Sequence, residues 1–190
     1  QHLKKLLEQH KSSNAELINS IGSLKLLQRN ELIALGTQKG YYVKGSMSII
    51  DMQFSSAPYN ILDESLKSIM NSNQSFIDKV IELTRDLINT YNQCSTNMNA
   101  IASLSTELAL ILYFSTDDYE TSYDQLVKSY DFYFSSGWKY IGVTLLEVYI
   151  ENLDKLIEQR GLDVVFQLLS SYVTLAVNKS AKFDESHFKK

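Results

Sequence analysis

The sequence contains few residues that interrupt helices. Among its 190 residues are one proline and seven glycines. Proline removes a backbone donor, and glycine lowers the stability of helix and strand interiors, so both gather at turns. A β-sandwich or barrel needs turn residues every 8–12 positions or so, and that supply is missing here. The scarcity therefore predicts long helices joined by a small number of connections.

Cysteine and secretory features are equally scarce. The single cysteine, Cys94, excludes an internal disulfide and fits a reducing compartment, where it is expected to be a small helix residue rather than a nucleophile. No signal peptide opens the chain, and no run of about 18 apolar residues predicts a membrane span. The chain begins at Gln1, so we expect it to be a piece of a larger protein.

Excess positive charge is also absent. The formal net charge is −4, and the sequence holds no block of lysine and arginine. Proteins that track a phosphate backbone usually carry a basic stripe, so nucleic acid is excluded as a partner. Hydrophobic residues make up 44% of the chain and charged residues 21%, which is typical of a folded domain. We expect one helical domain over 1–190.

The first third of the chain predicts two helices and an irregular segment. A short helical pattern at Leu3–His10 ends at Lys11–Asn14, where Ser13 or Asn14 would cap the next helix. That helix would end near Gly36 and Gly40, and 37–60 would be an irregular loop or hold a short helix at 46–54. Its expected core residues are Leu17, Ile18, Ile21, Leu24, Ile33 and Leu35.

Helical periodicity is clear in the rest of the chain. Apolar spacing predicts a short helix over 61–70, an interruption at 71–73, and longer helices over about 76–91, 97–114, 118–134, 138–160 and 162–177, before a frayed polar tail at 179–190. The helix at 97–114 is apolar on most sides, so it should be buried on more than one face. Asp117 would cap the following helix, and Gly137 and Gly161 would close the ends of two others.

Helix spacing predicts the architecture. Successive helices begin about 20 residues apart, so each pair takes about 40, the scale of tetratricopeptide-like repeats. We therefore expect an all-α fold of antiparallel helical hairpins stacked as an α-solenoid. An irregular helical bundle is the alternative, because the repeats differ in sequence.

No pattern in the sequence predicts chemistry. The segment Gly40–Ser46 has the residues of a phosphate loop in the wrong order, and no strand precedes it. His2, His10 and His187 lack metal-ligand spacing, and Asp117 with Asp118 reads as helix capping between two helices. We expect no catalytic residue, no bound cofactor and no metal site.

Aromatic residues over 113–140 exceed what one buried stripe can hold. Tyr119 belongs to the stripe and Trp138 follows the Gly137 cap, so both are expected to be structural. Phe132, Tyr133 and Tyr140 lie off the stripe. They are either further core residues or contacts to a partner protein, because tyrosine and tryptophan are favoured at such interfaces.

Two segments together resemble a known family. One is Leu32–Gly36, which closes a helix. The other is Glu107–Tyr113, followed by Asp118-Tyr119-Glu120, by Gly137-Trp138-Lys139 and by Leu145-Leu146. Their order resembles the helical region of the large subunits of TRAPP, the transport protein particle, and most of all its TRAPPII-specific large subunit. Asp117 stands where the turn usually has glycine, and Ser122 where alanine is usual.

The resemblance implies a non-catalytic scaffold. TRAPP complexes act in vesicle tethering and as exchange factors for Rab GTPases, and the exchange chemistry belongs to their small core subunits. This chain would then contact other subunits of a tethering complex and a Rab GTPase only indirectly. It would be cytoplasmic and peripheral at Golgi (trans-Golgi) membranes through that complex.

An unrelated helical-repeat adaptor that binds peptides is the alternative function. A concave surface lined by asparagine, lysine or arginine would favour the adaptor, and a convex aromatic patch would favour a subunit interface. If Trp138 is buried, Trp138→Ala should destabilise the fold by about 3–5 kcal/mol. A near-zero change would assign Trp138 to an interface instead.

Overall fold

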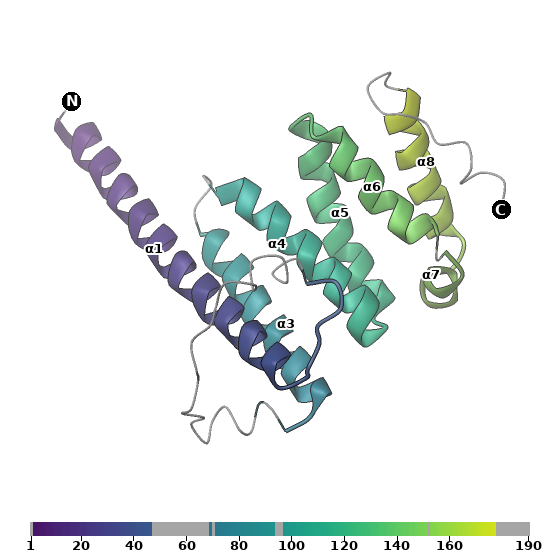
Figure 1. Ribbon diagram of the computed structural model, residues 1–190. Helices are drawn as coiled ribbons and strands as arrows, with labels where there is room; N and C mark the ends of the chain where they lie inside the picture. Colours follow the sequence, from purple (N-terminus) through teal and green to yellow (C-terminus); the bar gives the residue numbers. More distant parts are fainter. Residues whose placement is uncertain (1, 47–68, 70, 94–96, 152, 178–190) are drawn as a thin grey trace.

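The chain folds as an array of helices. The computed structural model describes residues 2–46, 69, 71–93, 97–151 and 153–177, and the regular elements in these ranges are all helical (Figure 1). They are α1 (His2–Gln38), α3 (Asn73–Tyr91), α4 (Met98–Ile111), the π-helical turn η3 (Leu112–Thr116), α5 (Tyr119–Ser135), α6 (Lys139–Ile150), α7 (Leu153–Arg160) and α8 (Asp163–Val177). The predicted all-α class is confirmed.

Each helix packs mainly on its neighbours in the sequence. Helix α1 packs on α3, α3 on α4, and α4 on α5, while α5 contacts α6 and α7, and both of these contact α8. Figure 1 shows the resulting row, from α1 on the left to α8 on the right. From α3 to α5 the connections are short, which places consecutive helices as antiparallel neighbours, in line with the predicted helical hairpins.

Helix α4 lies between two hydrophobic clusters. Leu104, Leu108 and Ile111 join a cluster with α1 and α3, whereas Ala102 and Ala109 join a cluster with α5 to α8. The prediction that this helix is buried on more than one face is confirmed. With η3 it also forms a segment, Met98–Thr116, that is long and apolar enough to cross a membrane by length and composition. Its window is 56% buried inside the protein, which accounts for the apolar composition.

Helix α1 differs from the sequence prediction in two ways. It is continuous from His2 to Gln38, so the predicted break at Lys11–Asn14 is wrong. Lysine, serine and asparagine lower helix propensity only slightly, whereas proline, which would force a break, is absent there. Its N-terminal half extends beyond α3 (Figure 1), and Leu17, Ile21 and Leu24 are exposed rather than in the core as predicted. Leu24 lies where α1 already packs on α3, so its exposure shows that it is on the outer face of the helix.

The C-terminal half of α1 packs closely on α3. Ile33 is buried as predicted, and Gly36 lies inside the helix rather than at its end. A Cβ atom at Gly36 would lie 2.1 Å from Cζ of Phe76, so the two helices approach as closely as they do because glycine is present. Gly40 takes the left-handed conformation beyond the helix end, with φ of 86°.

The predicted helix over 138–160 is two helices. Helix α6 ends at Ile150 and α7 begins at Leu153, so α7 packs on both α5 and α8. Gly137 and Gly161 have φ of 79° and 77°, which confirms both as left-handed residues at helix ends. The predicted loop and short helix within 47–60, the tail at 179–190 and Cys94 lie outside the described residues.

Candidate functional site

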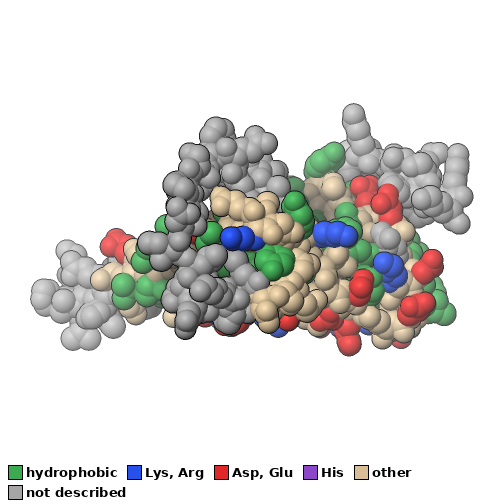
Figure 2. All heavy atoms as spheres, turned by 60° about the horizontal axis from the view of Figure 1, so that its bottom comes forward, with side chains coloured by type: hydrophobic (Ala, Val, Ile, Leu, Met, Phe, Trp, Pro, Cys, Tyr) green, Lys and Arg blue, Asp and Glu red, His purple; other side chains and the backbone are tan. Residues whose placement is uncertain are grey.

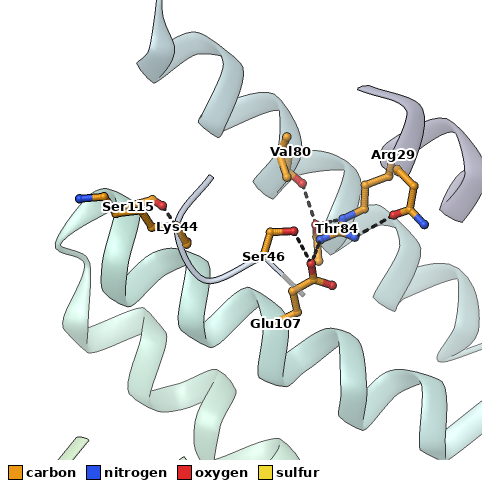
Figure 3. A network of polar contacts seen from close by, with 8 residues as sticks. Arg29, Lys44, Ser46, Val80, Thr84, Glu107 and Ser115 are labelled. Atoms are coloured by element: carbon orange, nitrogen blue, oxygen red, sulfur yellow. Dashed lines mark hydrogen bonds and ion pairs between the residues drawn. The ribbon is translucent and has the colours of Figure 1, made fainter. Parts of the chain in front are cut away.

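A buried polar network joins α1, α3 and α4 (Figure 3). The Arg29 guanidinium, which is fully buried, forms an ion pair of 2.7 Å with the Glu107 carboxylate. Arg29 Nε donates to Thr84 Oγ1 at 2.7 Å, and Ser46 Oγ donates to Glu107 Oε1 at 2.8 Å. Charges removed from water in this way persist because each is paired and hydrogen-bonded. The network is closed to solvent and therefore holds helices together rather than binding a substrate.

The segment that resembles a phosphate loop is part of this packing. Val43 is buried, and Ser115 Oγ donates to the Lys44 carbonyl oxygen. Gly45 lies against α4 so closely that a Cβ atom would be 2.4 Å from the Leu110 carbonyl oxygen. The glycine is thus explained by a close approach to a backbone, and the loop has no open cradle for a phosphate group.

The acidic turn between η3 and α5 has a structural role, because one of its aspartates caps α5. Asp118, not Asp117, is the N-cap of α5, and its carboxylate accepts from the Thr121 amide at 3.1 Å. Asp117 has φ of 55°, a left-handed conformation that asparagine and aspartate tolerate better than most residues. Its Oδ1 accepts from the Tyr119 hydroxyl at 2.5 Å. The predicted cap is therefore shifted by one residue, because the π-helical turn before it adds a residue to the connection.

Metal-ligating residues do not gather within the described ranges. Over those residues, no group of three or more histidine, cysteine, aspartate or glutamate side chains is close enough to hold an ion. Basic side chains on the face shown in Figure 2 lie singly among hydrophobic ones, without forming a continuous stripe. That face accordingly offers no surface of the kind that tracks a phosphate backbone.

An aromatic groove is the most distinctive open feature. It lies between α4, the end of α5 and the start of α6, with a volume of about 440 Å³. Its lining is almost entirely apolar and includes Leu110, Phe132, Tyr133, Trp138, Tyr140 and Ile141. We refer to it as the aromatic groove. The sequence predicted three of these residues as possible partner contacts, and the structure brings all three to one place.

The three predicted contact residues differ in exposure. Tyr140 is 72% exposed and Phe132 is half-buried. Tyr133 is only 6% exposed, and its hydroxyl lies 3.3 Å from Thr106 Oγ1. The interface alternative is therefore wrong for Tyr133, which belongs to the core because it faces α4. Exposed Ile141, which the sequence analysis missed, lies one residue after Tyr140 and belongs to the same apolar lining.

Trp138 is not a core residue. Its side chain is 53% exposed and stacks on Tyr133, with ring centroids 6.4 Å apart and planes at 16°. The residue forms the N-cap position of α6, directly after the left-handed Gly137. That turn directs the indole along the groove rather than into either cluster. We therefore expect Trp138→Ala to cost about 1 kcal/mol, the value of an aromatic contact, instead of 3–5 kcal/mol.

Tyr119 has the structural role predicted for it. The ring is buried and packs edge-on against Tyr113, with centroids 5.0 Å apart. The ammonium group of Lys155, from α7, lies over the Tyr119 ring, with Nζ 5.3 Å from the ring centroid. Tyr119 therefore joins the start of α5 to the adjacent η3 and to α7, which is distant in sequence.

Sequence comparison identifies the family of this helical array. Residues 1–176 match the family model described as the TR130 NTS domain. The chain belongs to the TR130 NTS domain family. The predicted resemblance to a TRAPPII large subunit is confirmed, since the match spans α1 to α8 up to residue 176.

A curated relative points the same way. The chain is 23% identical over 142 residues to the trafficking protein particle complex II-specific subunit 130 of Saccharomyces cerevisiae. The alignment covers 74% of this chain and 12% of the yeast protein, so the chain spans about one eighth of the length of that relative. No solved structure matches the chain.

Proposed function

We propose that the TR130 NTS domain chain is a non-catalytic scaffold segment of a TRAPPII-type large subunit. In this role it supports vesicle tethering and Rab GTPase exchange at Golgi membranes through protein–protein contacts. It meets a Rab-type GTPase only indirectly, through other subunits of the complex. It reaches the membrane as a peripheral part of that complex.

Family membership supports the place of the chain in such a complex. The relative in yeast is named as a subunit specific to trafficking protein particle complex II, and the similarity extends over most of this chain. A stacked helical array suits a scaffold because each helix packs mainly on nearby helices and leaves long faces open to partners.

The exposed apolar residues of the aromatic groove are the main support for a role in protein–protein contacts. Tyr140, Trp138 and Ile141 expose apolar surface together, and such a cluster is rare on a monomer unless a partner covers it. Tyrosine and tryptophan also dominate the binding energy of protein interfaces. A helix or loop of another subunit that fills the groove would bury both rings against α4 and α6.

The test is co-purification of the full-length protein from cells. We expect a tagged protein to recover the TRAPP core subunits, and Trp138→Ala with Tyr140→Ala to reduce that recovery at least tenfold, since alanine at two central contacts commonly costs more than 1 kcal/mol each. The matched control is Tyr42→Ala with Leu24→Ala, because both side chains are exposed on other elements.

Two outcomes contradict the proposal. One is recovery of no core subunit by the unmodified protein. The other is equal recovery by the groove variant and the control, which would remove the aromatic groove from the interface. Far-ultraviolet circular dichroism of each variant separates loss of binding from loss of fold.

A further inference from the structure

A second groove lies on the opposite side of the first turns of α4. It is bounded by the end of α3, by α4 and by the middle of α5, with a volume of about 460 Å³. Met98, Ile101 and Phe132 contribute apolar surface, and Arg85, Asn89, Asn92, Gln125 and Lys128 contribute polar groups. We refer to it as the polar-rimmed groove. Phe132 separates it from the aromatic groove, since that ring lines both.

Two unpaired cations face this groove from different helices. Arg85 of α3 and Lys128 of α5 are exposed, and neither forms an ion pair or side-chain hydrogen bond with the described residues. Four other cations have acidic partners: Arg29 with Glu107, Lys25 with Asp86, Lys79 with Glu82, and Arg160 with Asp124. The groove is thus a place where an acidic chain keeps positive charge uncompensated.

Amide side chains complete the polar rim. Asn89 lies on the last turn of α3, Asn92 is its C-cap and Gln125 lies opposite on α5, and their side chains have no hydrogen-bond partner among the described residues. An amide both donates and accepts, so asparagine and glutamine suit the alternating groups of an extended peptide backbone. The exposed Met98 side chain is flexible and adapts to apolar side chains of different shape.

We propose that the polar-rimmed groove binds an extended segment of a partner protein that carries carboxylate and apolar side chains. Carboxylates of that segment pair with Arg85 and Lys128, its backbone bonds the amide rim, and an apolar side chain covers Met98 and Ile101. Nucleic acid fits less well, because two cations on a chain of net charge −4 make no phosphate track. This site goes beyond the proposed scaffold role and does not depend on it.

The experiment selects peptides from a phage-displayed library of random dodecapeptides on the immobilised intact protein. We expect the enriched peptides to contain aspartate or glutamate together with large apolar residues. The most enriched peptide is then labelled with fluorescein, and its Kd is measured by fluorescence polarisation. We expect Arg85→Ala with Lys128→Ala to raise that Kd at least tenfold, and replacement of the acidic residues of the peptide by their amides to do the same.

A matched variant controls for overall charge. Lys39→Ala with Lys44→Ala removes the same two charges from exposed positions outside the groove, and its Kd should stay within twofold of the unmodified protein. The proposal is overturned if no peptide is enriched, if the control weakens binding as much as the groove variant, or if the groove variant binds within twofold. Loss of core-subunit co-purification would leave this result unchanged, so the two proposals fail separately.

Discussion

At the scale of single residues, Ser122 shows why a departure from a repeat pattern can be structural. It stands where alanine is usual in the family pattern, and it is fully buried. Its hydroxyl donates to the Ala109 carbonyl oxygen at 2.7 Å and accepts from the Tyr149 hydroxyl. One side chain thus joins α4, α5 and α6. The sequence could reveal the departure but not the partner, because Tyr149 is 27 residues away.

We expect Ser122→Ala to lower the free energy of unfolding by about 1–3 kcal/mol, because the Tyr149 hydroxyl would lose its buried acceptor. Tyr149→Phe alone should also be destabilising. The double variant should be more stable than the sum of the two changes implies, by about 0.5–3 kcal/mol. Urea unfolding of the four proteins measures this coupling, and strict additivity would show that the two hydroxyls do not interact.

Tyr113 offers the opposite case, a buried hydroxyl without a partner among the described residues. A hydroxyl taken from water without a hydrogen bond opposes folding. Tyr113→Phe should therefore stabilise the protein by roughly 1 kcal/mol. Tyr119→Phe is the matched control, since its hydroxyl donates to Asp117 and its loss should be destabilising. A lower urea midpoint for Tyr113→Phe would contradict the assignment.

Burial of the same ring predicts how stability changes with pH. Burial, aided by the nearby Tyr119, raises the pKa of Tyr113 from 10.0 to about 12. Burial also raises the pKa of Tyr149, against a hydrogen bond with Ser122 that lowers it. The unfolded chain therefore loses these protons at lower pH than the folded protein does. The contribution of the two tyrosines to the free energy of unfolding is constant below about pH 10 and falls as the pH rises toward 12. We expect a smaller fall between pH 8 and pH 11 for Tyr113→Phe, measured by urea midpoints.

At the scale of elements, the burial of a helix was easier to predict from the sequence when the helix is packed on several faces than when it is packed on one. Helix α4 carries apolar residues all round, so its burial on two sides was evident from the sequence. Leucines on α1 are both exposed and buried, because the face that packs on α3 covers Leu32 but not Leu24 or Leu27, and the spacing alone does not identify that face. The aromatic groove was partly predictable because its off-stripe residues lie close together over 132–140, whereas the polar-rimmed groove was not, because its lining is spread over 85–132 without a pattern.

The contact between α1 and α3 gives a prediction of definite sign. In an exposed helix, Gly→Ala is stabilising by about 1 kcal/mol, because alanine restricts the unfolded chain and favours helix. At Gly36 the new Cβ atom would meet the Phe76 ring, so we expect Gly36→Ala to be destabilising by about 1–3 kcal/mol. Ser23→Ala, on an exposed position of α1, is the control and should change stability by less than about 0.5 kcal/mol. Thermal unfolding distinguishes the two.

At the scale of the whole molecule, the array has two hydrophobic clusters, and α4 contributes residues to both of them. One cluster joins α1, α3 and α4, and the other joins α4 to α8. In such an array, stability is approximately the sum of each helix's own stability and its nearest-neighbour contacts. Helix α4 contributes to both clusters, so it couples the two halves into one folding unit. The buried Arg29–Glu107 pair strengthens this coupling, because it joins α1 directly to α4.

Hydrogen exchange of the intact protein tests this arrangement. We expect backbone amides of α4 to exchange slowest, because opening that helix exposes both clusters to water. Amides in the N-terminal half of α1 should exchange fastest among the described helices, since that half extends beyond α3 and Leu17 is exposed (Figure 1). Glu107→Ala should then speed exchange in α1, α3 and α4 together, because it leaves the Arg29 charge buried without its carboxylate. Faster exchange confined to α4 would show that the ion pair does not couple these helices.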